Sequence, residues 1–247
     1  MKVLIVTREL PPIGGGAGNV AMQLAEQLAE QGNHISIVTM HYGDLPLYED
    51  RGKITIHRIR CGRKNQDSSY LIEMLRFVFA ARSVVSKITR IERWDIIHAH
   101  AIVPDGIIAL AASRKARCPF VLTAHGSDVP GYNPDYFQLS HVFIRIFWSR
   151  VIDAAGAVVA PSRYLTGLIQ RVKPNLPVVL IPNGVSIGIF KERPKNTAFL
   201  IVSRLVRRKN YQLFLKALRD IRAPQVVHIV GDGPMLTELK ELASKLL

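Results

Sequence analysis

Short apolar runs alternate with amphipathic segments along the whole chain, and this alternation limits the chain to an α/β fold. The first run, residues 3–7, is almost continuously apolar, as expected of a strand buried on both faces of a parallel sheet. After it, Val20, Leu24 and Leu28 recur four residues apart and predict a helix. We therefore expect a mostly parallel sheet with helices on both faces.

The same pattern continues to the end of the chain. Further strands are predicted at 35–39, 53–59, 95–99, 119–123, 157–160, 178–181, 199–202 and 226–230, and helices at 70–91, 104–115, 137–152, 162–171 and 211–221, with a last helix running into the terminus. The turn at residues 182–184 divides this series. We expect a complete first domain over 1–184 and an incomplete second domain over 185–247, because two strands and two helices are too few to cover both faces of a parallel sheet.

The charge is strongly positive: 33 Lys and Arg against 19 Asp and Glu give +14. Such an excess favours an anionic partner. Nine cations are concentrated in one segment: Arg58, Arg60, Arg63, Lys64, Arg76, Arg82, Lys87, Arg90 and Arg93. A solvated helix face and a surface for anionic lipid both explain this segment. Nucleic acid is the weakest alternative, because no nucleic-acid motif is present and aromatic residues make up only 7%.

Cysteine usage and the absence of a targeting signal indicate a cytoplasmic protein. Cys61 and Cys118 have neither metal nor redox spacing, which favours a reducing compartment. The N-terminal apolar stretch is too short for a signal peptide. Helix 70–91 carries Glu73 and several cations, which argue against a membrane span. Peripheral attachment at the inner face of a membrane remains open.

A Gly-rich loop, residues 11–18, connects the first strand to the first helix. Gly15 and Gly16 would let a ligand approach the backbone, and the helix N-terminus favours an anion. A dinucleotide fingerprint is excluded, because Asn19 stands where its third glycine would be. Taken by itself, the loop is better explained as a tight turn that binds no ligand.

Histidines and acids cluster at predicted strand ends. His125 follows a strand and could donate to a substrate hydroxyl or accept a proton, and a loop histidine satisfied by backbone is the alternative. His98 and His100 share one strand face; we expect His98 in the core and His100 within reach of substrate. Asp105 and Asp128 fit helix capping as well as substrate contact. With no carboxylate or cysteine at ligand spacing nearby, we expect no metal.

Arg204 and Lys209 follow the strand at 199–202. Ligands of open α/β sheets bind at the carboxyl ends of strands. A planar guanidinium fork and a compact ammonium suit a diphosphate. Gly231 and Gly233 form a turn after the next strand, which would open toward the same edge. This arrangement points to a nucleotide-diphosphate leaving group.

In this order the motifs resemble the family 4 glycosyltransferases of the GT-B type, which are retaining enzymes. The matching segments are residues 11–16, 98–100, 123–126, 161–162, 181–185 with Phe190, 203–205 with Lys209, and 231–234. The resemblance implies two Rossmann-like domains, with the acceptor on the first and the sugar nucleotide on the second. It implies transfer to a lipid-linked, polysaccharide or small-molecule acceptor, in cell-envelope or polysaccharide biosynthesis.

The resemblance also implies roles for individual residues. Arg204 and Lys209 would neutralise the departing diphosphate in place of a metal, so no cofactor is expected beyond the sugar nucleotide. Gly15, Gly16, Gly231 and Gly233 would belong to the donor site. His125 would contact the transferred sugar and act with Arg204 and Lys209 in catalysis, while His100 and Asp128 would lie on the acceptor side.

Two departures from the family pattern limit the expectation. Ser186 stands where the family often has Asp. The family's Glu-x₇-Glu signature is missing, since Glu238 and Glu241 have the wrong spacing and the sequence ends at Leu247. We therefore expect residues 1–247 to be part of a longer enzyme and to have little transferase activity alone. The alternative is a naturally short, non-catalytic acceptor-binding or membrane-recruiting subunit that needs a partner chain.

Overall fold

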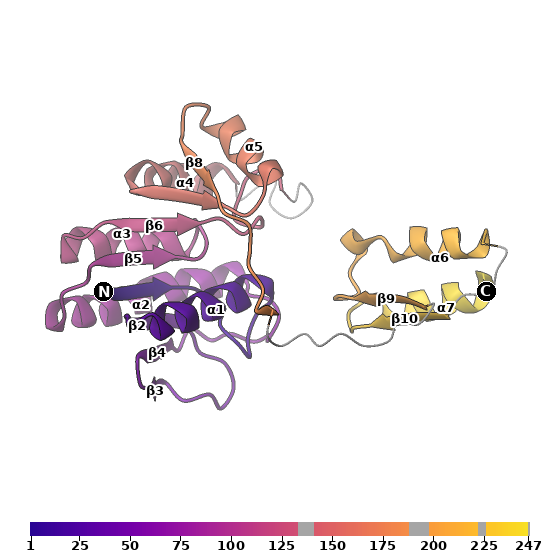
Figure 1. Ribbon diagram of the computed structural model, residues 1–247, viewed down its shortest axis with the longest axis horizontal. Coiled ribbons are helices and arrows are strands. Elements are labelled where there is room, and N and C mark those ends of the chain that lie inside the picture. Colours follow the sequence, from indigo (N-terminus) through magenta and orange to yellow (C-terminus); the bar gives the residue numbers. More distant parts are fainter. Residues whose placement is uncertain (133–140, 188–197, 222–225, 247) are drawn as a thin grey trace. The chain divides into compact units, whose positions relative to one another are not determined.

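The computed structural model describes residues 1–132, 141–187, 198–221 and 226–246 (Figure 1). Residues 137–140 of a predicted helix, and Phe190, lie outside these ranges. The chain divides into two compact units, Met1–Val185 and Ser186–Leu247. Each unit is an α/β structure with its own core, as the alternation predicts. Among the described helices, none is long and apolar enough to cross a membrane.

The first unit is built on an eight-stranded sheet in the order β3-β4-β2-β1-β5-β6-β7-β8. Its strands are β1 Lys2–Val6, β2 His34–Met40, β3 Tyr48–Arg51, β4 Ile54–Ile59, β5 Ile96–Ala99, β6 Phe120–Thr123, β7 Ala157–Ala160 and β8 Val178–Leu180. All neighbouring pairs are parallel except β3 with β4. The chain moves outward from β1 to one edge and returns to β5, so the carboxyl ends of β1 and β5 form a topological switch point.

Both faces of this sheet are packed. On one face, α1 (Gly16–Glu30) places Met22 and Ala25 against alternate residues of the central strands, including Val3 and Ile5. On the other face, Leu4 and Val6 belong to a larger core contributed by the remaining helices. These helices are α2 Leu71–Ile91, α3 Asp105–Ala116, α4 His141–Ala154 and α5 Arg163–Val172. The period-two alternation along β1 thus divides its side chains between two cores.

The second unit contains two parallel strands, β9 (Ala198–Val202) and β10 (Val226–Val230). A 3₁₀ turn, η2 (Arg207–Lys209), and helices α6 (Tyr211–Arg219) and α7 (Leu236–Leu246) complete it. Its core is small and lies on the helix side, formed by Leu205, Tyr211, Leu215, Leu218, Met235 and Leu239. Outward residues of the strands are more than half exposed: Leu200, Val202, Val226 and Val230. The prediction that apolar strand surface stays uncovered here is confirmed.

The structure corrects two parts of the sequence-based picture. β3 was not predicted, because its sequence, Tyr-Glu-Asp-Arg, has no apolar alternation and pairs only at the sheet edge. The basic segment is not uniformly solvated, since Arg58 and Arg63 are buried. Arg58 pairs with Glu49 at 2.7 Å, and Arg63 donates to the carbonyls of Asn65 and Gln66. These two cations hold loops and are unavailable to an external anion.

Gly106 offers a test of how tightly α3 is packed. A Cβ at this position would lie 2.6 Å from Val151 Cγ1 and 2.9 Å from Leu122 Cδ2. We expect Gly106→Ala to lower the free energy of unfolding by about 1–3 kcal/mol through overpacking. Gly167→Ala in α5 is the matched control, because its Cβ would meet nothing within 4 Å. That control should raise stability by about 0.5–1 kcal/mol. Urea unfolding measures both, and equal effects would contradict the packing described.

Candidate functional site

The candidate site of the first unit lies at the carboxyl edge of its sheet, where β1, β5 and β6 end side by side. Residues 7–9 follow β1, His100 follows β5, and His125 follows β6 by two residues. His100 N donates to Val6 O at 2.9 Å, and Ala124 N donates to Val159 O at 2.9 Å, so the pairing extends past the strand ends. The strand ladder therefore brings together polar residues that are far apart in sequence.

Three histidines form a row along this edge. The ring centroids of His98 and His100 are 4.3 Å apart, and those of His100 and His125 are 5.3 Å apart in a stacked arrangement. His100 Nδ1 lies 3.2 Å from His125 Nε2, and His98 Nε2 lies 2.8 Å from Thr123 Oγ1. We predicted that His98 lies in the core. In the structure its side chain is only partly buried, and it contacts the Thr123 hydroxyl at the end of β6.

All three rings are held in the neutral form. Burial lowers the pKa of His98 to about 4 and that of His100 well below its ordinary value, and neighbouring histidines add to the effect. Burial also lowers the pKa of His125, against a smaller opposing influence from the Asp128 carboxylate. A neutral imidazole has one donor and one acceptor nitrogen. In the His100–His125 pair one nitrogen therefore carries the proton and the other accepts it.

Asp128 ties the two histidine-bearing loops together. Its Oδ1 accepts from His125 N at 3.0 Å, and its Oδ2 accepts from Ile102 N at 2.8 Å. Its carbonyl accepts from Trp148 Nε1 at 3.0 Å, which links the loop to α4. Both carboxylate oxygens thus have backbone partners that fix the position of His125. Contacts of His100 and Asp128 with an acceptor stay predictions.

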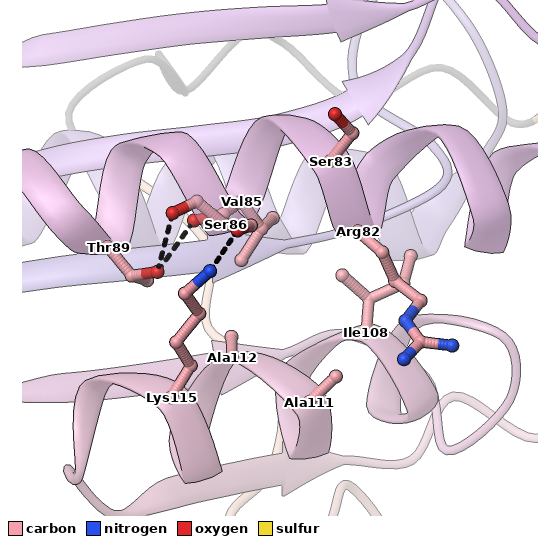
Figure 2. Close-up of a pocket in the computed structure, with 9 residues that line it drawn as sticks. All are labelled: Arg82, Ser83, Val85, Ser86, Thr89, Ile108, Ala111, Ala112 and Lys115. Atoms are coloured by element: carbon pink, nitrogen blue, oxygen red, sulfur yellow. Dashed lines mark hydrogen bonds between the residues drawn. The ribbon is translucent and has the colours of Figure 1, made fainter.

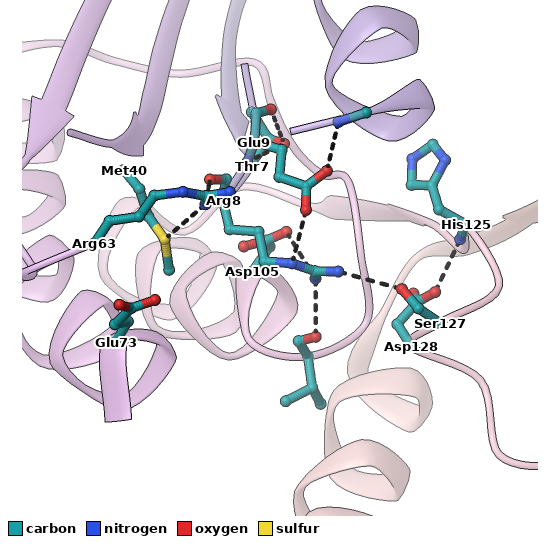
Figure 3. Close-up of polar contacts among 12 residues, drawn as sticks. Thr7, Arg8, Glu9, Met40, Arg63, Glu73, Asp105, His125, Ser127 and Asp128 are labelled. Carbon is teal, nitrogen blue, oxygen red and sulfur yellow. Dashed lines mark hydrogen bonds and ion pairs between the residues drawn. The ribbon is translucent and has the colours of Figure 1, made fainter. Parts of the chain in front are cut away.

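Arg8 is the central cation of this edge (Figure 3). Its guanidinium donates to Val103 O and to Ser127 Oγ, both at 3.3 Å, and lies 3.9 Å from Asp105 Oδ2. Asp105, the first residue of α3, is completely buried, and neither of its oxygens has a hydrogen-bond partner among the described residues. Burial raises the pKa of Asp105 to about 8, although Arg8 acts in the opposite direction. The carboxyl group is therefore mostly protonated at neutral pH.

Glu9 fastens the Gly-rich loop to the end of β1. Glu9 Oε2 accepts from Gly15 N at 3.1 Å, at the start of α1. A Cβ at Gly14 would lie 2.5 Å from Glu9 Cβ, and Gly14 has a φ of +89°, so only glycine fits there. A Cβ at Gly15 or Gly16 would meet nothing within 4 Å. The protein's own packing thus explains Gly14 and leaves the space beside Gly15 and Gly16 open.

Arg8 and Glu9 were not predicted from the sequence, where glycines, histidines, Asp105 and Asp128 are the candidates of the first unit. The available signal was their position, directly after the first strand and before the Gly-rich loop. Because ligands bind at the carboxyl ends of strands, a charged pair at such an end is as good a candidate for the site as His125.

The second unit carries its own cluster at the carboxyl ends of β9 and β10. Arg204 lies two residues after β9, Lys209 ends η2, and both are exposed. The two strand ends are joined by Ser203 N donating to Val230 O at 3.1 Å and Leu205 N donating to Asp232 O at 2.8 Å. The cations therefore project from a turn region fixed by the parallel ladder.

Gly231 and Gly233 have a structural reason to be glycine. Each has a φ of +154°, and a Cβ would collide with Ser203 O in one case and with Leu205 O in the other. These close approaches let the chain after β10 cross the chain after β9. Binding of a donor by these glycines stays a prediction.

No group of three His, Cys, Asp or Glu among the described residues could hold a metal ion. In the histidine row, His98 Nε2 contacts Thr123 and His100 Nδ1 contacts His125 Nε2, whereas the buried His100 Nε2 has no hydrogen-bond partner among the described residues. Metal independence was expected from the sequence, and it remains an expectation.

Comparison with known proteins gives consistent matches over the whole chain. The family described as Glycosyltransferase Family 4 matches residues 14–188, and Glycosyl transferases group 1 matches residues 186–247. An uncharacterized glycosyltransferase of Methanocaldococcus jannaschii is 24% identical over 245 residues, covering 99% of this chain and 64% of that protein. Alpha-monoglucosyldiacylglycerol synthase of Streptococcus pneumoniae is 23% identical over 269 residues, covering 100% of this chain and 59% of that protein. The chain thus spans about three fifths of the length of these relatives.

Among solved structures, sucrose-phosphate synthase from Thermosynechococcus elongatus matches with a TM-score of 0.73 at 17% identity. The match covers 99% of this chain and 67% of that chain. This likeness concerns the fold, and it confirms the predicted α/β, GT-B-like class.

The buried Asp105 makes stability depend on pH in a defined direction. Its pKa is raised in the folded protein, so between about pH 4 and pH 8 the unfolded chain carries an ionised Asp105 and the folded chain a protonated one. The contribution of this group to stability is therefore complete below its ordinary pKa and is lost as the pH rises to about 8. We expect Asp105→Asn, which cannot ionise, to reduce this decline.

Denaturant unfolding at a series of pH values from 5 to 8.5 measures the effect. Asp153→Asn is the control, because this α4 carboxylate is exposed and pairs with Lys173. Parallel curves for the native chain and Asp105→Asn would show that Asp105 does not titrate in this range.

Proposed function

Because this chain belongs to glycosyltransferase family 4, we propose that it carries out, within its full protein, transfer of a sugar from a nucleotide-diphosphate sugar to an acceptor with retention of configuration. The observation that carries this proposal is the pair of exposed cations, Arg204 and Lys209, at the carboxyl end of β9. Charge develops on the diphosphate as the sugar departs, and fixed cations stabilise it most in that state.

The second unit would bind the donor. Arg204 provides a planar fork for phosphate oxygens, and Lys209 provides a point charge. The turn at Gly231 and Gly233 gives the backbone close to these cations its shape. Two cations can supply the positive charge that a divalent metal supplies elsewhere, so we propose a metal-independent reaction. Open space beside Gly15 and Gly16 in the first unit supports their role in donor binding.

The first unit would bind the acceptor and orient the sugar. His125 is neutral, fixed by Asp128, and hydrogen-bonded to His100, so it can donate to or accept from a sugar hydroxyl. Arg8 acts through Ser127 on the same loop and would be a positioning residue. The buried Asp105 carboxyl, 3.9 Å from Arg8, is protonated at neutral pH and therefore does not neutralise this cation.

The acceptor is lipid-linked, a polysaccharide or a small molecule. A lipid-linked acceptor is supported by the matched relative named as a glucosyldiacylglycerol synthase. A cytoplasmic location belongs to the same proposal, because Cys61 and Cys118 are both free and buried.

Arg204→Ala tests the donor site. Loss of a charge-assisted hydrogen bond removes about 1.5–3 kcal/mol, so we expect binding of the matching nucleoside diphosphate to weaken roughly 10- to 100-fold. A thermal-shift titration with UDP, GDP and ADP measures the affinity and identifies the base. Arg207→Ala, on the exposed η2 turn, is the matched control and should change affinity little. Unchanged affinity in Arg204→Ala would contradict the assignment.

We keep a second candidate, a non-catalytic acceptor-binding or membrane-recruiting subunit that needs a partner chain. The same titration separates the two candidates. Donor binding that depends on Arg204 supports the transferase. Absence of binding to all three nucleotides, together with a complex of defined composition in purified material, supports the subunit.

A further inference from the structure

The outward surface of α2 carries an unusual amount of exposed apolar area near its N-terminal end. Leu71, Ile72, Leu75 and Phe79 are 49, 54, 47 and 71% exposed. They recur three or four residues apart and therefore lie along one side of the helix. Isolated exposed apolar residues are ordinary, but a contiguous group of them marks an interaction surface.

The exposed surface of α2 also carries cations, most of them toward its C-terminal end. Its exposed cations are Arg76, Arg82, Lys87 and Arg90. The single acid of this helix, Glu73, is buried, and its two oxygens accept from Tyr70 N at 2.8 Å and Lys64 N at 3.0 Å. The exposed surface of α2 therefore combines apolar side chains with cations and has no acid of its own to offset them.

A recess of about 320 Å³ lies between α2 and α3 on this surface (Figure 2). Arg82 and Lys115 border it, and the hydroxyl-bearing residues Ser86 and Thr89 line it together with Ala111 and Ala112 of α3. Lys115 Nζ donates to Ser86 Oγ, and Thr89 Oγ1 donates to Val85 O at 2.8 Å. Two cations beside hydroxyl groups are suited to a phosphate group attached to an apolar molecule.

The apolar end of α2 begins at the same sheet edge as the candidate site. Gly14 N in the Gly-rich loop donates to Gln66 O at 2.8 Å, and Gln66 Nε2 donates back to Pro12 O at 2.7 Å. Asn65 Nδ2 donates to the hydroxyl of Tyr70, the residue before α2, at 3.2 Å. The exposed apolar side chains thus start one loop away from Gly15.

We propose that this α2 surface docks on a bilayer of anionic phospholipid, with a lipid phosphate in the α2–α3 recess. The apolar residues enter the interfacial layer, and the cations contact phosphates beside them. Apolar side chains on the same stripe favour lipid over nucleic acid, whose backbone offers them no apolar environment. Docking would place the edge that carries the Gly-rich loop beside the membrane, where a lipid-linked acceptor enters. The docking itself is a binding property and does not depend on the proposed transferase activity.

Vesicle sedimentation tests the proposal with the full chain. We expect binding to vesicles that contain phosphatidylglycerol in phosphatidylcholine, much weaker binding to phosphatidylcholine alone, and weakening as NaCl rises. Each Lys or Arg near an anionic surface strengthens binding about five-fold, so Arg82→Gln with Lys115→Gln should weaken it roughly 25-fold. The control is Lys53→Gln with Lys240→Gln, which removes two positive charges from exposed positions outside α2 and α3. This control should weaken vesicle binding much less.

The apolar residues need a separate pair of variants. Leu75→Ser with Phe79→Ser should weaken vesicle binding at least about ten-fold, because two large apolar side chains no longer enter the interface. Leu200→Ser with Leu213→Ser removes two equally exposed leucines from the second unit and serves as control. Circular dichroism verifies that every variant is folded.

Three outcomes would overturn the proposal. The first is the absence of salt-sensitive binding to the anionic vesicles. The second is an equal loss in the α2 variants and their controls, which would indicate diffuse attraction by the net charge. The third is tighter binding to a DNA duplex than to the vesicles, lost in the Arg82 and Lys115 variant.

Discussion

The carboxylate of Asp128 holds the candidate site of the first unit together. One oxygen accepts from the backbone of the loop after β6 and the other from the backbone of the loop after β5. The parallel ladder brings both loops to the same edge, and this carboxylate adds a direct link between them. The contact between His100 and His125 follows from it, because each ring sits on one of the bridged loops. Asp128 therefore contributes to the geometry of His100 and His125, the two residues that could exchange hydrogen bonds with a substrate.

Desolvation determines the charge state of this edge. Burial keeps the histidine row neutral and the Asp105 carboxyl protonated, so Arg8, Glu9 and Asp128 are the charged side chains around them. The second unit differs, because its two cations are exposed and belong to a unit with a small core. The first unit therefore offers neutral hydrogen-bonding groups in a fixed arrangement, and the second offers positive charge. In the proposed reaction, neutral hydrogen-bonding groups would recognise a sugar or acceptor hydroxyl, and positive charge would neutralise the diphosphate.

The parallel architecture could be predicted from the sequence because the central strands, such as residues 3–7 and 35–39, are apolar on both faces. β3 could not, since its four polar residues form a strand only through pairing with β4. The positions of His125 and His100 at one edge followed from strand order. The role of Asp128 depends on two backbone N–H groups in separate loops, which no local pattern encodes. Arg58 and Arg63 look like surface cations in the sequence, and only tertiary contacts show that they are buried.

Glu9 has a consequence for any anion that approaches the first turn of α1. That turn attracts negative charge through its backbone N–H groups and dipole, yet Gly15 N already donates to the Glu9 carboxylate. An external phosphate that binds Gly15 N would therefore compete with a carboxylate that is tethered six residues away and present at high effective concentration. A weakly bound monoanion would lose this competition, whereas a diphosphate held at several points could win it. Selection of multivalent anions over monoanions would follow at this loop, where Gly14 makes room for the tethered acid.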